Sequence, residues 1–202
     1  MHLNRQGRAG ASVLETTVVI AVIGVMLSIL MPMLGMVREN ALSTRCQQHL
    51  RALGIAVVHY MADYRFENWL PASGPAGGSL WFEKLAPFVG GQETGRWGEN
   101  FVCPRAPWSQ RGLARDTVSY GWNEQFLPFG TLQSKVANPD ETIVIADSLA
   151  GPRCDVVLPA EGELRLDARH RERANVLFAS GNVAGMTREE ALFEWPRYWD
   201  RE

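Results

Sequence analysis

Aromatic and charged side chains are missing from long stretches of this chain. None of the 19 Phe, Trp and Tyr residues precedes Tyr60, and residues 16–37 contain no charged side chain. The chain therefore consists of two parts suited to different solvents. Its composition, with 46% hydrophobic residues and a single long apolar run, excludes a disordered chain, a collagen-like repeat and a multi-span membrane protein.

The chain also lacks the short motifs that mark common catalytic centres. It contains no CxxC or HExxH sequence, no Gly-rich phosphate loop, no Ser/His/Asp order typical of a triad and no carboxylate pair at an informative spacing. We therefore expect no enzymatic activity. A net charge of -2 gives no general case for nucleic-acid binding. Acidic residues interrupt the arginines of residues 164–173, which favours a solvated face, so no nucleic-acid partner is expected.

A run of 22 uncharged residues, 16 of them hydrophobic, extends over residues 16–37. A helix of about 20 residues rises roughly 30 Å, the thickness of the hydrocarbon core of a bilayer. The run is longer than the roughly 7–15 apolar residues of a secretory signal peptide. No Ala-x-Ala cleavage site follows it. The run predicts one membrane-spanning helix that contacts membrane lipid. We expect that it is not removed as a signal peptide.

Glu15 lies at the start of this run, and the nearest preceding basic residue is Arg8. A carboxylate at the centre of a membrane helix costs on the order of 2.5–3.5 kcal/mol, so it requires a partner. Taken alone, Glu15 fits a residue that sits in the lipid headgroups where the span begins. Its neighbours favour another interpretation.

Gly10, Glu15, Gly24 and Pro32 follow a fixed register. If the mature chain begins at Ala11, then Glu15, Gly24 and Pro32 are its fifth, fourteenth and twenty-second residues. This register resembles the N-terminal segment of type IV pilins and type II secretion pseudopilins. In that family a basic leader ends in Gly, a prepilin peptidase cuts after it, and the new amino terminus is methylated. The family usually has Phe at the position of Ala11.

The resemblance implies how the chain is processed and where it resides. Residues 1–10 are the leader, and residues 11–37 form the transmembrane and filament-core helix, with a kink expected at Pro32. The Ala11 amine of one subunit pairs with the Glu15 carboxylate of a neighbour in low-dielectric surroundings. The precursor is expected to be a single-pass inner-membrane protein with its C-terminal domain in the periplasm. Its expected partners are the prepilin peptidase, the inner-membrane assembly platform, and other pseudopilins or copies of itself in a periplasmic or surface filament.

A stripe of apolar residues at helical spacing continues beyond the membrane segment. Its members are Leu42, Cys46, Leu50, Leu53, Val57, Tyr60 and Tyr64. The stripe predicts an amphipathic helix over residues 38–68 that packs on a sheet, followed by a loop-rich globular domain over residues 69–202. A short helix is expected over residues 80–88, and Thr187 is expected to open a capped helix near the C-terminus.

Six segments have the composition of strands: residues 101–103, 118–121, 142–146, 154–158, 174–179 and 182–186. A long helix followed by such strands predicts an α+β fold, in which the N-terminal helix packs on a C-terminal antiparallel sheet as in pilins.

Residues near the C-terminus carry a second resemblance. His170 is followed after nine residues by Ser180 and Gly181, in a stretch that reads Asn-Val-Leu-Phe-Ala-Ser-Gly-Asn-Val. A large set of pilin-like proteins has a C-terminal signature of His, nine residues and Asp-Gly. A turn role is favoured, with Gly181 at positive φ in a hairpin and His170 bonding across it. The alternative is a calcium site, as in related major pseudopilins, which the loss of a carboxylate at Ser180 weakens; no other cofactor or metal is expected.

Three cysteines, Cys46, Cys103 and Cys154, leave at least one unpaired in an exported protein. A bridge between Cys103 and Cys154 is favoured because both lie in the expected sheet region. Cys46 then remains buried on the helical stripe.

The two resemblances together imply a structural subunit of a type II secretion pseudopilus. A minor subunit of a type IV pilus is the close alternative, because both kinds of subunit share this N-terminal segment. An alternative of another class is a membrane-anchored extracytoplasmic binding module that does not polymerise.

Overall fold

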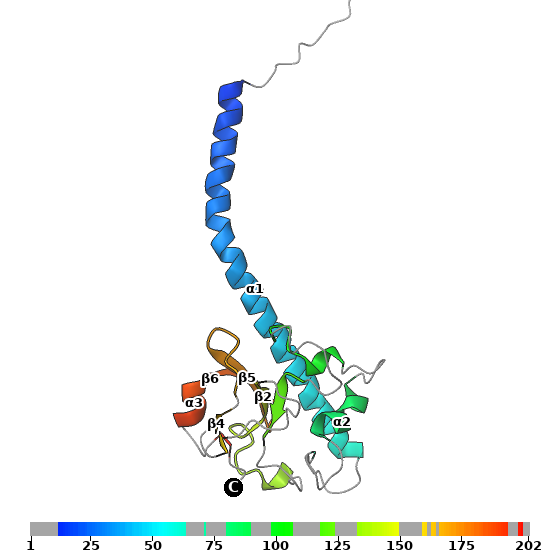
Figure 1. Cartoon of the computed structure of the whole chain (residues 1–202). Coiled ribbons are helices and arrows are strands. Elements are labelled where there is room, and N and C mark those ends of the chain that lie inside the picture. The colour runs from blue at the N-terminus through cyan, green and yellow to red at the C-terminus, as the bar shows by residue number, and fades with distance from the viewer. Residues whose placement is uncertain are drawn as a thin grey trace, which may run out of the picture. The chain divides into compact units, whose positions relative to one another are not determined.

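The computed structural model describes residues 12–63, 71, 80–89, 98–106, 118–123, 133–149, 159–160, 163–164, 166–193 and 198–199. The chain divides into two compact units, Met1–Glu39 and Asn40–Glu202. Helix α1 (Val13–Asp63) contributes residues to both units (Figure 1).

The first unit is helical from Val13 onward and is apolar on all sides of the helix. Residues 12–38 are all exposed in the single chain, and a helix that is hydrophobic all round normally lies inside a large core or a membrane. Among the described residues, α1 is the one helix long and apolar enough to cross a bilayer. It therefore fits a single membrane anchor. The helix continues through Pro32 without a break, and the kink expected there stays a prediction.

In the second unit, the remainder of α1 buries one face. The buried residues are Cys46, His49, Leu50, Leu53, Ala56, Val57, Tyr60 and Met61. They contain the core of the predicted stripe, so the amphipathic continuation of the helix is confirmed up to Asp63. Gly54 lies on this face, where an added Cβ would stand 3.1 Å from Cδ1 of Leu177. The missing side chain at Gly54 thus allows α1 to pack closely on the sheet.

The sheet of the second unit has four strands, β1 (Tyr120–Trp122), β2 (Ile143–Asp147), β5 (Arg173–Phe178) and β6 (Val183–Thr187). Their order is β1-β2-β5-β6, and each neighbouring pair is antiparallel. A separate pair joins β3 (Pro159–Ala160) to β4 (Glu163–Leu164). The prediction of an α+β fold with an antiparallel sheet is confirmed.

Each face of the sheet has its own hydrophobic core. One core joins α1 to Val144, Leu177 and to the aromatic residues of β1 and of α2 (Trp81–Leu85), which precedes a 3₁₀ turn at Ala86–Phe88. The other core contains Ile143, Val176 and Phe178. Strand β5 therefore shows the alternation of a two-sided strand. Strand β2 is buried throughout, and a register shift between Ile143 and Ile145 accommodates its pairing with β5.

Several predicted elements are confirmed and one is wrong. Strands occur close to the expected residues 118–121, 142–146, 174–179 and 182–186, and a helical segment occupies most of residues 80–88. Residues 101–103 do not form a strand, because Glu99–Phe101 is a 3₁₀ helix that ends just before Cys103. The predicted strand at residues 154–158 lies outside the described residues.

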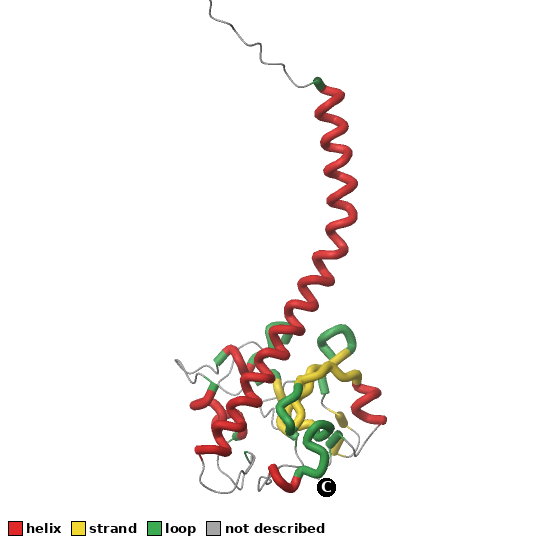
Figure 2. The backbone as a smooth tube through the Cα atoms, turned by 180° about the vertical axis from the view of Figure 1, so that it is seen from behind, coloured by secondary structure: helices red, strands yellow, loops and turns green. Residues whose placement is uncertain are grey.

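Strands β5 and β6 are joined by a hairpin loop (Figure 2). Gly181 has a φ of 89° and its N–H donates to the carbonyl of Phe178. The N–H of Ser180 donates to the carbonyl of Pro139, 2.9 Å away, so the turn is also fixed to the loop before β2. Gly181 is required here because a side chain would be strained at positive φ.

Helix α3 (Arg188–Phe193) begins with the predicted capping box. The Glu190 N–H donates to Oγ1 of Thr187 at 3.1 Å, and the Thr187 N–H donates to Oε2 of Glu190 at 2.8 Å. After α3, Trp199 is fully buried and its indole N–H donates to the carbonyl of Ala191. Trp199 therefore belongs to the second core.

Replacing Thr187 by Ala removes one half of this capping box. We expect the variant to lose about 1 kcal/mol of stability, whereas Thr187→Ser, which keeps the hydroxyl, should lose much less. Tryptophan fluorescence during urea unfolding of the detergent-solubilised chain measures the change, because all seven Trp residues follow Tyr60. Equal losses in the Ala and Ser variants would show that the hydroxyl does not stabilise the helix.

Candidate functional site

The N-terminal site predicted from the sequence is only partly described. Gly10 and Ala11 lie outside the described residues. Glu15 lies in the first turn of α1 with an exposed side chain, and its carboxylate has no hydrogen bond or ion pair to any other described residue. Cleavage after Gly10 and pairing between Ala11 and Glu15 of different subunits therefore stay predictions.

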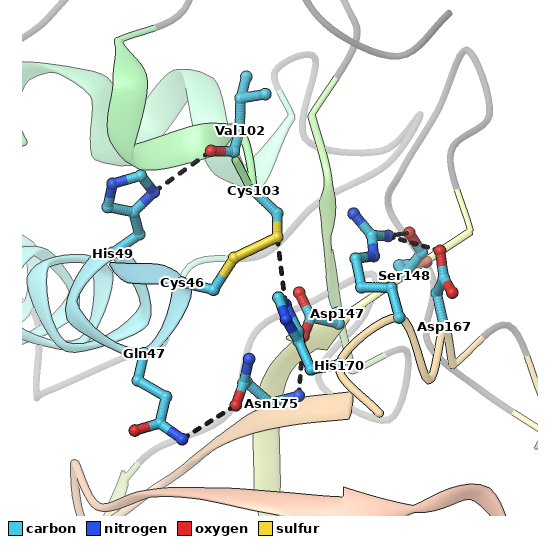
Figure 3. A network of polar contacts seen from close by, with 11 residues as sticks. Cys46, Gln47, His49, Val102, Cys103, Asp147, Ser148, Asp167, His170 and Asn175 are labelled. Atoms are coloured by element: carbon cyan, nitrogen blue, oxygen red, sulfur yellow. Dashed lines mark hydrogen bonds and ion pairs between the residues drawn. A yellow bond between two sulfur atoms is a disulfide. The ribbon is translucent and has the colours of Figure 1, made fainter. Parts of the chain in front are cut away.

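A second site is buried in the globular unit and was not predicted as a whole. Cys46, Cys103, Asp147 and His170 come together with their ligand atoms within 4.8 Å of one another (Figure 3). Cys46 comes from α1, Cys103 follows the 3₁₀ helix Glu99–Phe101, Asp147 ends β2, and His170 precedes β5. All four residues are buried. Four segments far apart in the sequence thus place two sulfurs, an imidazole and a carboxylate at one point.

The disulfide in this cluster corrects the predicted pairing. Cys103 is bonded to Cys46, with their Cα atoms 5.4 Å apart, so a bridge between Cys103 and Cys154 is wrong. The helical stripe turns Cys46 inward, where the loop after Phe101 passes over it. The bridge closes a loop with a sequence separation of 57, which the chain-entropy estimate converts to a stabilisation of about 4 kcal/mol. Cys154 lies outside the described residues.

Two other contacts join α1 to the same loop. The Nδ1–H of His49 donates to the carbonyl of Val102 at 3.2 Å, and Arg45 forms an ion pair with Glu99 at 2.9 Å. The ion pair is exposed and contributes at most about 1 kcal/mol. Burial lowers the pKa of His49, which favours the neutral imidazole in this contact. The disulfide is therefore the strongest of these links between the loop and the helix.

The signature predicts that His170 bonds across the hairpin, and this prediction is wrong. Strand β5 separates His170 from Ser180 and Gly181. Its Nε2 atom lies 3.3 Å from Sγ of Cys103 and 3.6 Å from Oδ2 of Asp147. The two residues after it, Arg171 and Glu172, have φ values of 53° and 62°. This tight turn brings the His170 backbone opposite Arg173. The signature histidine thus contributes to the buried cluster, and the Ser-Gly pair contributes to the turn.

Asp147 is completely buried and accepts one strong hydrogen bond. The N–H of Asn175 donates to Oδ2 of Asp147 at 2.7 Å, while Oδ1 has no hydrogen-bond partner among the described residues. Burial raises the pKa of the Asp147 carboxyl to about 7, although the Arg169 guanidinium opposes the rise. Burial also lowers the pKa of His170 to about 4. At pH values between about 4 and 7 the neutral forms of both groups are therefore favoured, and their 3.6 Å contact joins two neutral groups.

Polar side chains around the cluster hold its members in place. The Gln47 side-chain amide donates to Oδ1 of Asn175 at 3.1 Å. Arg169 pairs with Asp167 at 2.9 Å and also donates to the Ser148 carbonyl. With a side chain only 5% exposed, Arg169 does not belong to the solvated arginine face predicted for residues 164–173. The turn before β5 instead draws this arginine inward.

The donor types indicate what the buried site can bind. Calcium takes six to eight oxygen ligands, whereas this cluster offers two sulfurs, one nitrogen and one carboxylate. A further carboxylate that could supply oxygen ligands, Asp167, is paired with Arg169. The cluster therefore has the chemistry of a structural disulfide or of a site for a softer metal ion. Sequence signals for it were the inward position of Cys46 on the stripe and an acid, Asp147, at the end of a wholly apolar strand.

Comparisons of this chain with protein-family models, with curated proteins and with solved structures found no match.

Replacing Asp147 by Asn removes one titrating group from this cluster. Folded Asp147 has a pKa of about 7, compared with 3.8 for an aspartate in an unfolded chain. Raising the pH through this window therefore favours the unfolded chain, which releases the proton. We expect the stability of Asp147→Asn relative to the parent chain to increase from about pH 4 to pH 7 and to level off above that range. Urea unfolding of the disulfide-bonded chain at several pH values measures this, and a difference independent of pH would contradict a buried neutral carboxyl.

Proposed function

We propose that this chain is a pilin-like structural subunit of a type II secretion pseudopilus. In this proposal the prepilin peptidase cuts the precursor after Gly10, and the mature chain assembles through its N-terminal helix. The observation that carries the proposal is the register of Gly10, Glu15, Gly24 and Pro32 at the start of a helix that is apolar on all sides.

The physical demands of the first unit support assembly. Residues 12–38 are exposed in the single chain, so their apolar surface must be covered by lipid or by other helices. Exchange of lipid for neighbouring helices keeps this surface out of water. Such a helix can leave the membrane only into a bundle of similar helices.

Glu15 supplies the specificity that apolar packing lacks. Its carboxylate has no partner within the described part of the chain, and low-dielectric surroundings make an unpaired charge costly. The amine of Ala11 on a neighbouring subunit, freed by cleavage, is the cation that the proposal pairs with it. Pairing of the amine and the carboxylate fixes the axial position of one helix against the next.

The second unit is consistent with an exported domain. It has two hydrophobic cores of its own and a buried disulfide, and disulfides persist mainly in oxidising compartments. A periplasmic location of this unit follows from the proposal. The same properties would suit a minor type IV pilus subunit, and neighbouring genes for a secretion ATPase and secretin, or for a retraction motor, would distinguish the two.

Replacing Glu15 by Ala tests the assembly step. An unpaired amine at a cost of about 2.5–3.5 kcal/mol should reduce incorporation into filaments at least tenfold, while cleavage by the peptidase proceeds. The measurement is the amount of mature chain in sheared surface filaments when the chain is overproduced with its secretion machinery.

Two matched variants accompany this test. Glu15→Asp keeps the charge and should retain part of the assembly, and Glu189→Ala removes an exposed carboxylate from α3 and should assemble as the parent chain does. Filaments with normal amounts of Glu15→Ala would contradict the pairing. Complete absence of filaments with the parent chain, despite cleavage, would favour the membrane-anchored binding module.

A further inference from the structure

We propose that Cys46, Cys103, Asp147 and His170 bind one zinc ion when the two cysteines are reduced. Zinc sites in proteins are usually tetrahedral and take Cys sulfur, His nitrogen and Asp or Glu oxygen. The cluster supplies one ligand atom from each of four residues, and all four atoms lie within 4.8 Å of one another. The donor number and the donor types are therefore those of a closed zinc site.

The distances in the disulfide-bonded state already approach those of such a site. Bond lengths of about 2.3 Å to sulfur and 2.0–2.2 Å to nitrogen or oxygen give a tetrahedron with edges of roughly 3.3–3.8 Å. Nε2 of His170 lies 3.3 Å from Sγ of Cys103 and 3.6 Å from Oδ2 of Asp147. Two edges thus need almost no change, no ligand atom lies more than 4.8 Å from another, and the two sulfurs separate after reduction.

Neighbouring groups position the Asp147 carboxylate and supply a positive charge near it. The N–H of Asn175 donates to this same Oδ2 at 2.7 Å and fixes the carboxylate, which is the role that outer hydrogen bonds have around metal ligands. The other carboxylate oxygen, Oδ1, is buried with no hydrogen-bond partner among the described residues, so no hydrogen bond from a described residue holds the carboxylate away from an ion. Two thiolates and one carboxylate leave a zinc complex with one negative charge, and the Arg169 guanidinium acts electrostatically on Asp147.

The disulfide and the zinc complex are alternative states of the same two sulfurs. Reduction breaks the S–S bond and adds two electrons and two protons, which gives two thiols; a phosphine supplies the electrons and becomes a phosphine oxide with oxygen from water. Zinc then displaces the two thiol protons. Thiols persist in reducing compartments and disulfides in oxidising ones, so the redox state of the surroundings decides which state forms. The inference is independent of the proposed function in filaments.

The test uses the full chain in detergent, with Cys154→Ser as the background so that Cys154 cannot contribute a thiolate. The metal-free chain is reduced with a phosphine and titrated with zinc against a chromophoric chelator. We expect one zinc ion per reduced chain and none in the disulfide-bonded chain. Cobalt in place of zinc should give the visible absorption of a tetrahedral complex and the near-ultraviolet charge-transfer absorption of cobalt–thiolate bonds.

Single-ligand variants locate the ion. Substituting a residue that only hydrogen-bonds to a metal ligand weakens metal binding roughly 10- to 100-fold. In this background, His170→Ala and Asp147→Asn remove ligands themselves, so each should weaken zinc binding by more than that. His59→Ala removes an exposed histidine from α1 and should bind zinc as the background chain does. If the His170 and Asp147 variants bound zinc as tightly as the background chain, the proposal would be overturned, because the ion would then be held by the thiols alone.

Tryptophan fluorescence reports in parallel whether each reduced chain is folded. If reduction alone unfolds the domain, zinc should restore the folded signal, because binding to a site that exists only in the folded state stabilises that state. A reduced chain that neither binds zinc nor regains its fold on addition of zinc would also overturn the proposal.

Discussion

The exposed apolar surface of residues 16–37 is the main physical constraint on this protein. All of these residues are exposed in the single chain, and burial of apolar surface is the dominant favourable contribution to folding and association. The chain cannot meet this demand by itself, so it needs a membrane, a bundle of similar helices, or each in turn. Glu15 adds a carboxylate to the same helix, and we propose that this charge selects the amine of a neighbouring subunit as its partner.

The globular unit contains a second feature that is energetically costly, a pair of buried ionisable residues. Asp147 and His170 are buried beside a disulfide, where charged groups are costly. The protein keeps them neutral over a range of pH and gives Asp147 one backbone hydrogen bond. Buried polar groups without full sets of partners are rare in native domains. Their presence where α1, β2 and β5 meet favours a binding role for this cluster in addition to a structural one.

Local sequence signals predicted the elements that local interactions determine. The stripe of α1, strands β2 and β5, the capping box at Thr187 and the turn at Gly181 all depend on residues close together in the chain. The disulfide partner of Cys103, the position of His170 and the burial of Arg169 depend on contacts between distant segments, which spacing does not encode. Residues 101–103 misled because their apolar composition suits a strand, whereas Glu99–Phe101 closes as a single 3₁₀ turn.

The central claim is that the chain begins, after processing, at Ala11 and that its N-terminal helix then assembles with those of other subunits. Mass spectrometry of the intact chain, extracted from membranes of cells that also contain its prepilin peptidase, tests this claim most directly. We expect a mature chain that begins at Ala11 and is ten residues shorter than the precursor, with or without one methyl group on its amine. An intact chain that still begins at Met1, or one cut beyond Val37, would contradict it.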